Sequence, residues 1–161
     1  MENLLYRGVS ESIHRLAGAA LRPKETAAFA RRASWDKAAW DESDWGESIQ
    51  NGVVEHQLEQ AGFPTSGIST TPHLQRAIYY ATHGDRAEVG YVYVIDRATL
   101  DAHHIRVHVV SDHVTHPSAP NDDEVILVAN DCGPLPSAIV LEVRRVSVQL
   151  LVQADAVHGP V

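Results

Sequence analysis

The spacing of hydrophobic residues changes along the chain, from helix-like in the first half to strand-like in the second. A short apolar strand is predicted at the start, over Leu4–Val9. Alanine-rich segments at helical spacing then predict helices over 14–21, 24–40 and 48–61. Ser10 or Ser12 can cap the first of them. Arg22-Pro23 separates the first two, because proline lacks a backbone donor and restricts the residue before it.

The second half begins with a brief extended segment, Gly67–Thr70, and a helix that follows Pro72 and ends at Gly84. From Val89 onward the apolar residues follow the period of two that is typical of strands. Strands are predicted over 89–96, 104–110, 124–129 and 138–152. Helices followed by strands indicate an α+β fold rather than a doubly wound sheet. Since no repeat or linker divides the chain, residues 1–161 are expected to form a single domain.

Composition and charge exclude several classes of function. The chain has 161 residues and a formal net charge of −8, which argues against general affinity for nucleic acid or anionic membranes. Its single cysteine, Cys132, can form neither an internal disulfide nor a cysteine-based zinc site. No segment approaches the ~20 apolar residues that cross a bilayer, and the first residues do not resemble a secretory signal. A soluble domain is therefore expected.

The first segment with candidate chemistry is Leu5-Tyr6-Arg7-Gly8-Val9. An arginine among apolar strand residues is costly to bury unless its donors meet an anion. The adjacent glycine would let a ligand approach the backbone closely. The alternative is an edge-strand arginine whose guanidinium reaches solvent.

Two further segments carry candidate chemistry. Ser69-Thr70-Thr71 stands between an extended segment and a helix, where its hydroxyls could either cap that helix or donate into a cleft. In the acidic segment before Val125, Asp122 and Glu124 would share one face of a strand, roughly 7 Å apart. Two such carboxylates could bind a sugar and stabilise positive charge, or could simply belong to a solvated loop.

In this order, the three segments resemble the ADP-ribosyltransferase family, and more narrowly its arginine–serine–glutamate class of toxin-like mono-ADP-ribosyltransferases. The resemblance implies two packed, mainly antiparallel sheets that form a cleft for NAD, the co-substrate. It also implies cleavage of the bond between nicotinamide and ribose. Because that cleavage builds an oxocarbenium-like cation, catalysis would rest on positioning and on a nearby anion.

The resemblance also implies roles for residues of the first two segments. Arg7 would clamp the phosphates of the dinucleotide through charge-assisted hydrogen bonds. The backbone of Gly8 would hold the nicotinamide carboxamide. Ser69 would orient the catalytic glutamate and brace the ribose, while Thr70 and Thr71 would shape the pocket wall. On this reading the two segments form the NAD-binding side of the site.

In the third segment Glu124 would be the catalytic glutamate, which binds a ribose hydroxyl and stabilises the cation. Asp122 would contact the acceptor, but it is one methylene shorter than the Glu or Gln typical of protein-modifying members. The preceding loop, 111–121, also lacks the aromatic residue often found there. Both departures weaken the expectation of arginine specificity.

Three functions remain open from the sequence. The first is transfer of ADP-ribose to a macromolecule, with a protein as the expected acceptor and nucleic acid disfavoured by the net charge. The second is an NAD glycohydrolase with water as acceptor, and the third is a non-catalytic domain that binds NAD or a partner. By analogy with toxins and effectors, an immunity or antitoxin protein would be a natural partner. The site of action would then be the cytoplasm, or the cytosol of a cell into which the protein is delivered.

Several histidines, including His104 and His108, invite a metal interpretation. On an extended strand these two would lie roughly 13 Å apart, too far to bind one ion. No metal is therefore expected. The absence of a GxGxxG or Walker loop also predicts that NAD would not be held as in a Rossmann fold.

Overall fold

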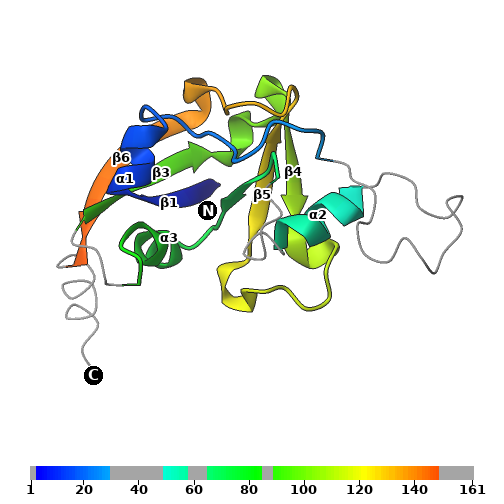
Figure 1. Ribbon diagram of the computed structural model, residues 1–161, viewed down its shortest axis with the longest axis horizontal. Helices are drawn as coiled ribbons and strands as arrows, with labels where there is room; N and C mark the ends of the chain where they lie inside the picture. Colours follow the sequence, from blue (N-terminus) through cyan, green and yellow to red (C-terminus); the bar gives the residue numbers. More distant parts are fainter. Residues whose placement is uncertain (1–2, 30–48, 58–64, 85–88, 149–161) are drawn as a thin grey trace, which may run out of the picture.

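The computed structural model describes residues 3–29, 49–57, 65–84 and 89–148, and within them the strands form two three-stranded antiparallel sheets (Figure 1). The first sheet has the order β1-β3-β6, with β1 at Leu4–Ser10, β3 at Val89–Asp96 and β6 at Val140–Ser147. The second has the order β2-β5-β4, with β2 at Ile68–Thr70, β5 at Val125–Ala129 and β4 at Ile105–Val109. The strand pairs in both sheets are antiparallel, which agrees with the mainly antiparallel sheets that the family resemblance implied.

The main hydrophobic core lies between the two sheets. Leu5 of β1 and Ile95 of β3 belong to the same buried cluster as Val125 and Leu127 of β5, and Leu5, Ile95 and Leu127 are fully buried. Alternation along each strand produces this layer, because successive side chains point to opposite faces of a sheet. The two sheets are therefore packed against each other through one shared core.

The helices α2 and α3 cover the outer faces of the two sheets (Figure 1). Helix α3, Leu74–Ala81, packs on the first sheet, where the backbone oxygen of Ala77 lies only 1.8 Å from where a Cβ on Gly8 would be. Helix α2, Ile49–Gln57, packs on the second sheet, where Val53 shares a buried cluster with Ile126. Gly8 thus serves a close helix–strand contact, since any side chain there would displace α3.

A backbone bridge between Tyr6 and Thr71 joins the two sheets beside the candidate residues. The backbone N–H of Tyr6 donates to the carbonyl of Thr71 at 2.8 Å, and the N–H of Thr71 donates to the carbonyl of Tyr6 at 3.0 Å. This bridge fixes β1 of the first sheet next to the end of β2 in the second. It therefore brings the Arg7 segment against the Ser69 segment.

The helices of the first half differ from the sequence prediction. The first, α1, is Glu11–Leu16 rather than 14–21, and Ser10 caps it by accepting a hydrogen bond from the N–H of Ile13 at 3.3 Å. Residues 24–29 form no helix, and 30–40 lie outside the described residues. The Ser10 cap starts the helix three residues earlier than the alanine pattern suggested. Gly18 then adopts a left-handed conformation just beyond the helix, which stops it before Leu21.

Elsewhere the predicted elements lie close to the observed ones. The strand predicted over 89–96 matches β3, and the helix predicted over 48–61 contains α2. The last strand is shorter than predicted over its described part, because a 3-10 turn at Ser137–Ile139 precedes it. Further 3-10 turns lie at Arg97–Thr99, Asp101–His103, Val110–Asp112 and Pro120–Asp122.

Candidate active site

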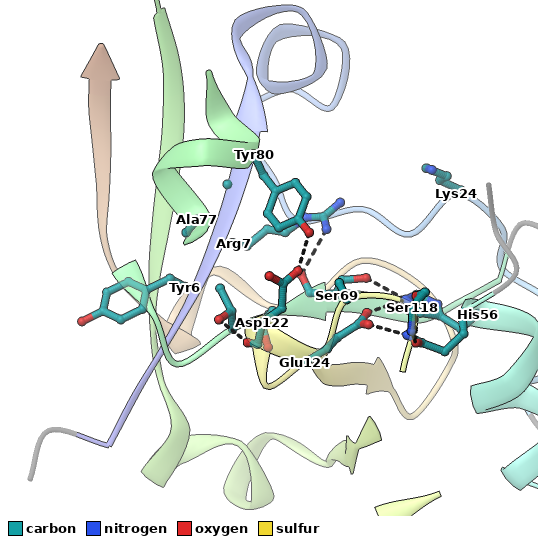
Figure 2. Close-up of a pocket in the computed structure, with 15 residues that line it drawn as sticks. Tyr6, Arg7, Lys24, His56, Ser69, Ala77, Tyr80, Ser118, Asp122 and Glu124 are labelled. Carbon is teal, nitrogen blue, oxygen red and sulfur yellow. Dashed lines mark hydrogen bonds and ion pairs between the residues drawn. The ribbon is translucent and has the colours of Figure 1, made fainter. Parts of the chain in front are cut away.

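One pocket of about 300 Å³ gathers all seven residues that the sequence singled out (Figure 2). This volume lies at the low end of the range of ~300–1,000 Å³ that is typical of small-molecule sites. The seven residues that line it are Arg7, Gly8, Ser69, Thr70, Thr71, Asp122 and Glu124. They come from β1, β2 and the segment that leads into β5, so segments far apart in sequence meet in one cavity.

Arg7 extends from the first sheet to the second. Alternation along β1 places it on the same side as Leu5 and Val9, which face the core between the sheets. Its guanidinium donates to the backbone carbonyl of Ser69 at 3.1 Å. Figure 2 shows Lys24 on the same side of the pocket. Two cationic side chains thus line this pocket.

The Thr71 hydroxyl accepts a hydrogen bond from the backbone N–H of His73, the N-cap residue of α3, at 3.1 Å, and both threonine hydroxyls also donate to the backbone beside Glu124. The Thr70 hydroxyl donates to the carbonyl of Val125 at 2.7 Å, and the Thr71 hydroxyl donates to the carbonyl of Asp122 at 2.5 Å. The residue at the N-cap position of α3, His73, makes no side-chain capping bond. Both hydroxyls therefore hold the backbone on either side of Glu124, which fixes the position of that residue relative to β2.

Glu124 lies immediately before β5, and its side chain contacts residues of α2. Its side chain is 13% exposed, and its Oε1 lies 3.4 Å from the Nε2 of His56. Its other oxygen accepts a hydrogen bond from the amide of Gln57. Burial acts to raise the pKa of Glu124, but hydrogen bonds from His56, Ser69 and Gln57 outweigh it and lower that pKa below its usual value. Glu124 is therefore held in its ionised form.

His56 connects the donors around Glu124. Its side chain is 2% exposed, with Nδ1 at 2.5 Å from the Thr65 hydroxyl and Nε2 at 2.7 Å from the Ser69 hydroxyl. With a proton on Nε2, His56 donates to Ser69, and the Ser69 hydroxyl is then directed to Glu124. The buried imidazole thus orients the serine that the sequence analysis had linked to the glutamate.

Gln57 ties Glu124 to the preceding loop. Its side-chain oxygen accepts hydrogen bonds from both the backbone N–H and the hydroxyl of Ser118, each at 2.9 Å. Because these donors fix the oxygen end of the amide, the NH₂ end must point to Glu124. The catalytic candidate and the loop before it are therefore held by one side chain of α2.

The prediction that Asp122 and Glu124 share one face of a strand is wrong. Asp122 ends the 3-10 turn Pro120–Asp122, and Asp123 has a left-handed backbone with φ 45°, so β5 begins only at Val125. The left-handed residue turns the chain between the two acids, which breaks the strand geometry. Asp122 still lines the pocket, but from the side of α3.

The Asp122 carboxylate is bound within the protein. Its side chain is 8% exposed, its Oδ1 accepts from the Nε of Arg76 at 2.5 Å, and its Oδ2 accepts from the Tyr80 hydroxyl. The hydrogen bond to Asp122 raises the pKa of Arg76, while burial and then the bond to Asp122 raise that of Tyr80. Both partners therefore remain protonated donors, and Asp122 forms an internal ion pair.

Sequence reasoning missed the residues that bind the two carboxylates, which are the α2 pair His56-Gln57 and the α3 pair Arg76 and Tyr80. It also missed Lys24 and Ser118 of the pocket lining. Each pair has a visible signal. His56-Gln57 is a polar pair in a predicted helix, and Arg76 and Tyr80 are four residues apart, which places them on one helix face. Neither signal identifies the carboxylate that the pair contacts.

No metal centre or membrane span is found in the described parts of the chain. No three His, Cys, Asp or Glu side chains among residues 3–29, 49–57, 65–84 and 89–148 lie where they could hold an ion. Within the same residues, no helix is long and apolar enough to cross a bilayer. The charged residues that line the described pocket include the cations Arg7 and Lys24 and the carboxylates Asp122 and Glu124.

Comparison with known proteins identifies the class of the chain. A model of the NarE family matches residues 4–127, which is well over half of the chain and includes the Arg7, Ser69 and Glu124 segments. The match defines the chain as ADP-ribosyltransferase-like. It belongs to the NarE family, named after a Neisseria protein of that class. No curated protein matches the chain.

Proposed function

We propose that the protein cleaves NAD between nicotinamide and ribose and transfers the ADP-ribosyl group to an acceptor. The observation that carries this proposal is an ionised carboxylate, Glu124, in the same pocket as the guanidinium of Arg7. A developing oxocarbenium ion needs a nearby anion, and a pyrophosphate needs cationic donors. The family to which the chain belongs supports the same chemistry.

In this mechanism Arg7, with Lys24 on the same side, binds the phosphates of NAD. Ser69 and Glu124 face the ribose that carries nicotinamide, and Glu124 accepts a hydrogen bond from a ribose hydroxyl. As the bond breaks, its electron pair leaves with the nicotinamide nitrogen and positive charge grows on the ribose. Glu124 then stabilises that charge, since its own charge is already present before the reaction begins.

The acceptor of the ADP-ribosyl group is proposed on separate grounds. A protein is the expected acceptor, and an immunity or antitoxin protein that covers the pocket is the proposed partner of a toxin-like enzyme of this kind. Water is the second candidate, which would make the protein an NAD glycohydrolase. The Asp122 ion pair favours it, because the carboxylate expected to contact an acceptor is already bound to Arg76 and Tyr80.

The direct test measures nicotinamide release from NAD by the wild-type protein and by Glu124→Gln. Loss of the anion is expected to reduce the rate by about 10³, on the scale of losing one preorganised electrostatic group. Glu142→Gln, which alters an exposed carboxylate of β6, is the matched control. Labelled NAD with a cell lysate then separates transfer, which labels macromolecules, from hydrolysis, which yields free ADP-ribose. A Glu124→Gln variant that keeps the wild-type rate would rule out the proposed role.

A further inference from the structure

A chain of hydrogen bonds runs from Ser118 through Gln57 to Glu124. The amide NH₂ of Gln57 donates to Oε2 of Glu124, and the amide oxygen accepts from the backbone N–H and the hydroxyl of Ser118, each at 2.9 Å. Gln57 lies 67 positions from Glu124 and 61 from Ser118, and all three residues line the pocket. One side chain at the end of α2 therefore joins the loop 111–121 to the candidate catalytic carboxylate.

Ser118 decides which end of the Gln57 amide faces Glu124. A glutamine amide has a donor end and an acceptor end of nearly equal size, so it can turn over in a given space. Turned over, it would bring its oxygen against the carboxylate, where two acceptors repel each other. The two donors of Ser118 hold the oxygen on the loop side and so prevent this. The donor that Glu124 receives thus depends on the position of the loop.

The contribution of Gln57 to Glu124 is mainly one of orientation. Burial acts to raise the pKa of Glu124, and among the hydrogen bonds that lower it the one from His56 is the strongest and the one from Gln57 the weakest. Loss of Gln57 alone would therefore leave Glu124 largely ionised. It would, however, release one of two fixed points, since Oε1 lies 3.4 Å from the Nε2 of His56 and Oε2 is held by Gln57. Holding both oxygens fixes the terminal torsion of a glutamate, which is otherwise broad.

The backbone around Glu124 is held separately. The Thr70 hydroxyl donates to the carbonyl of Val125 at 2.7 Å, and the Thr71 hydroxyl donates to that of Asp122 at 2.5 Å. The freedom that remains at Glu124 is thus in its side chain, and this is the part that the residues of α2 contact.

We propose that Gln57 is a positioning residue for the cleavage of NAD, which orients the carboxylate of Glu124 toward the ribose and depends on Ser118 for the orientation of its own amide. This inference rests on the proposed ADP-ribosyltransferase function and deepens it. The loop 111–121 then takes part in catalysis through Gln57, without contact between Ser118 and the reacting atoms. A change in the position of Ser118 would reach Glu124 by this route and alter the rate.

The experiment compares two variants of Gln57 in the full chain. Gln57→Glu keeps an acceptor for Ser118 but replaces the NH₂ donor by a second carboxylate oxygen. Because two carboxylates in contact do not both ionise readily, one pKa of the pair should rise by about one pH unit or more. Gln57→Met has a similar length and removes both contacts. Titration of the side-chain carboxyl groups by ¹³C NMR measures the pKa, and nicotinamide release from NAD gives kcat and KM.

The two variants should affect the reaction differently. Gln57→Met should lower kcat by roughly tenfold to a hundredfold, the scale of a misplaced catalytic group, with the KM for NAD and the acidic limb of the pH–rate profile near those of the wild type. Gln57→Glu should also move the acidic limb to higher pH. Ser118→Ala removes one of the two donors to the amide oxygen and should lower kcat by a smaller factor than Gln57→Met. Gln75→Glu adds the same charge at an exposed position of α3 and, as the matched control, should change neither quantity.

Two results would overturn the inference. One is an NMR titration of Gln57→Glu in which no carboxyl pKa is raised, since Gln57 would then not be in contact with Glu124. The other is a folded Gln57→Met protein with the kcat of the wild type. If the raised pKa is observed but even the wild type releases no nicotinamide, the contact exists and it is the proposed function that fails.

Discussion

Glu124 and Asp122 are two residues apart and line one pocket, yet their carboxylates are bound by different helices and by different kinds of donor. Glu124 is held by α2, through the imidazole of His56 and the amide of Gln57. Asp122 is held by α3, through the guanidinium of Arg76 and the hydroxyl of Tyr80. Two helices on the outer faces of the two sheets thus supply different donors to two neighbouring acids, as His56 and Tyr80 illustrate in Figure 2.

The difference lies in the formal charge of the donors. The imidazole of His56 makes the largest contribution to lowering the pKa of Glu124, followed by the Ser69 hydroxyl and the Gln57 amide, and none of the three is a permanent cation. Asp122, by contrast, is bound to an arginine, so the pair has no net charge. Glu124 therefore keeps a negative charge that can act on a substrate, whereas the charge of Asp122 is neutralised by Arg76.

After the loss of Glu124 itself, the largest effect is expected from removing the imidazole of His56, which binds Glu124. In His56→Leu the glutamate and Ser69 lose their shared donor while burial remains, so the pKa of Glu124 should rise. The rate of nicotinamide release at neutral pH should fall by about 10²-fold, within the range for groups that set a catalytic protonation state. The measurement is a pH–rate profile, whose acidic limb should move to higher pH.

The matched control for this prediction is His73→Leu. His73 also contacts a carboxylate, Asp123, at 2.6 Å, but both side chains are well exposed and neither lines the pocket. The His73→Leu variant should therefore have the acidic limb of its pH–rate profile at the same pH as the wild type. An unchanged acidic limb in a folded His56→Leu protein would show that His56 does not set the ionisation of Glu124.

The second prediction concerns the contribution of Asp122 to the stability of the protein. In Asp122→Asn the buried end of the ion pair loses its charge while Arg76 stays, which should lower the free energy of unfolding by about 1–3 kcal/mol. Chemical denaturation at pH 7 measures the change. Glu142→Gln, which breaks the exposed pair with Arg144, should cost less than about 1 kcal/mol. Equal effects of the two variants would mean that the Asp122 pair is no more than a surface contact.

The same contrast explains how far the sequence could predict the site. The three polar segments were visible because each interrupts an apolar pattern locally, and the structure brings them into one pocket. The prediction for Asp122 failed because strand alternation was extended through Asp123, whose left-handed backbone turns the chain. A single residue with positive φ thus changed which side of the pocket the acid occupies.

The helical partners could not be predicted in the same way. The contact between Gln57 and Glu124 joins residues 67 positions apart, and that between Arg76 and Asp122 joins residues 46 apart. Such pairs depend on which helix packs on which sheet, and local spacing does not specify this. The close contact between Gly8 and the backbone of α3 shows the same limit, because it too depends on which helix packs on which sheet.

The smallest expected effect is the contribution of Glu124 to stability as a function of pH. Its pKa is lower in the folded protein than in the unfolded chain, so the folded state favours the ionised form. The stabilisation is therefore fully present above the ordinary glutamate pKa and is lost as the pH falls through the lowered one. The free energy of unfolding, measured from pH 7 into the acidic range, should decline more for the wild type than for Glu124→Gln, which has no proton to bind. A parallel decline of the two proteins would mean that the donors of α2 do not favour the ionised form of Glu124, and the contrast with Asp122 would then rest on the ion pair alone.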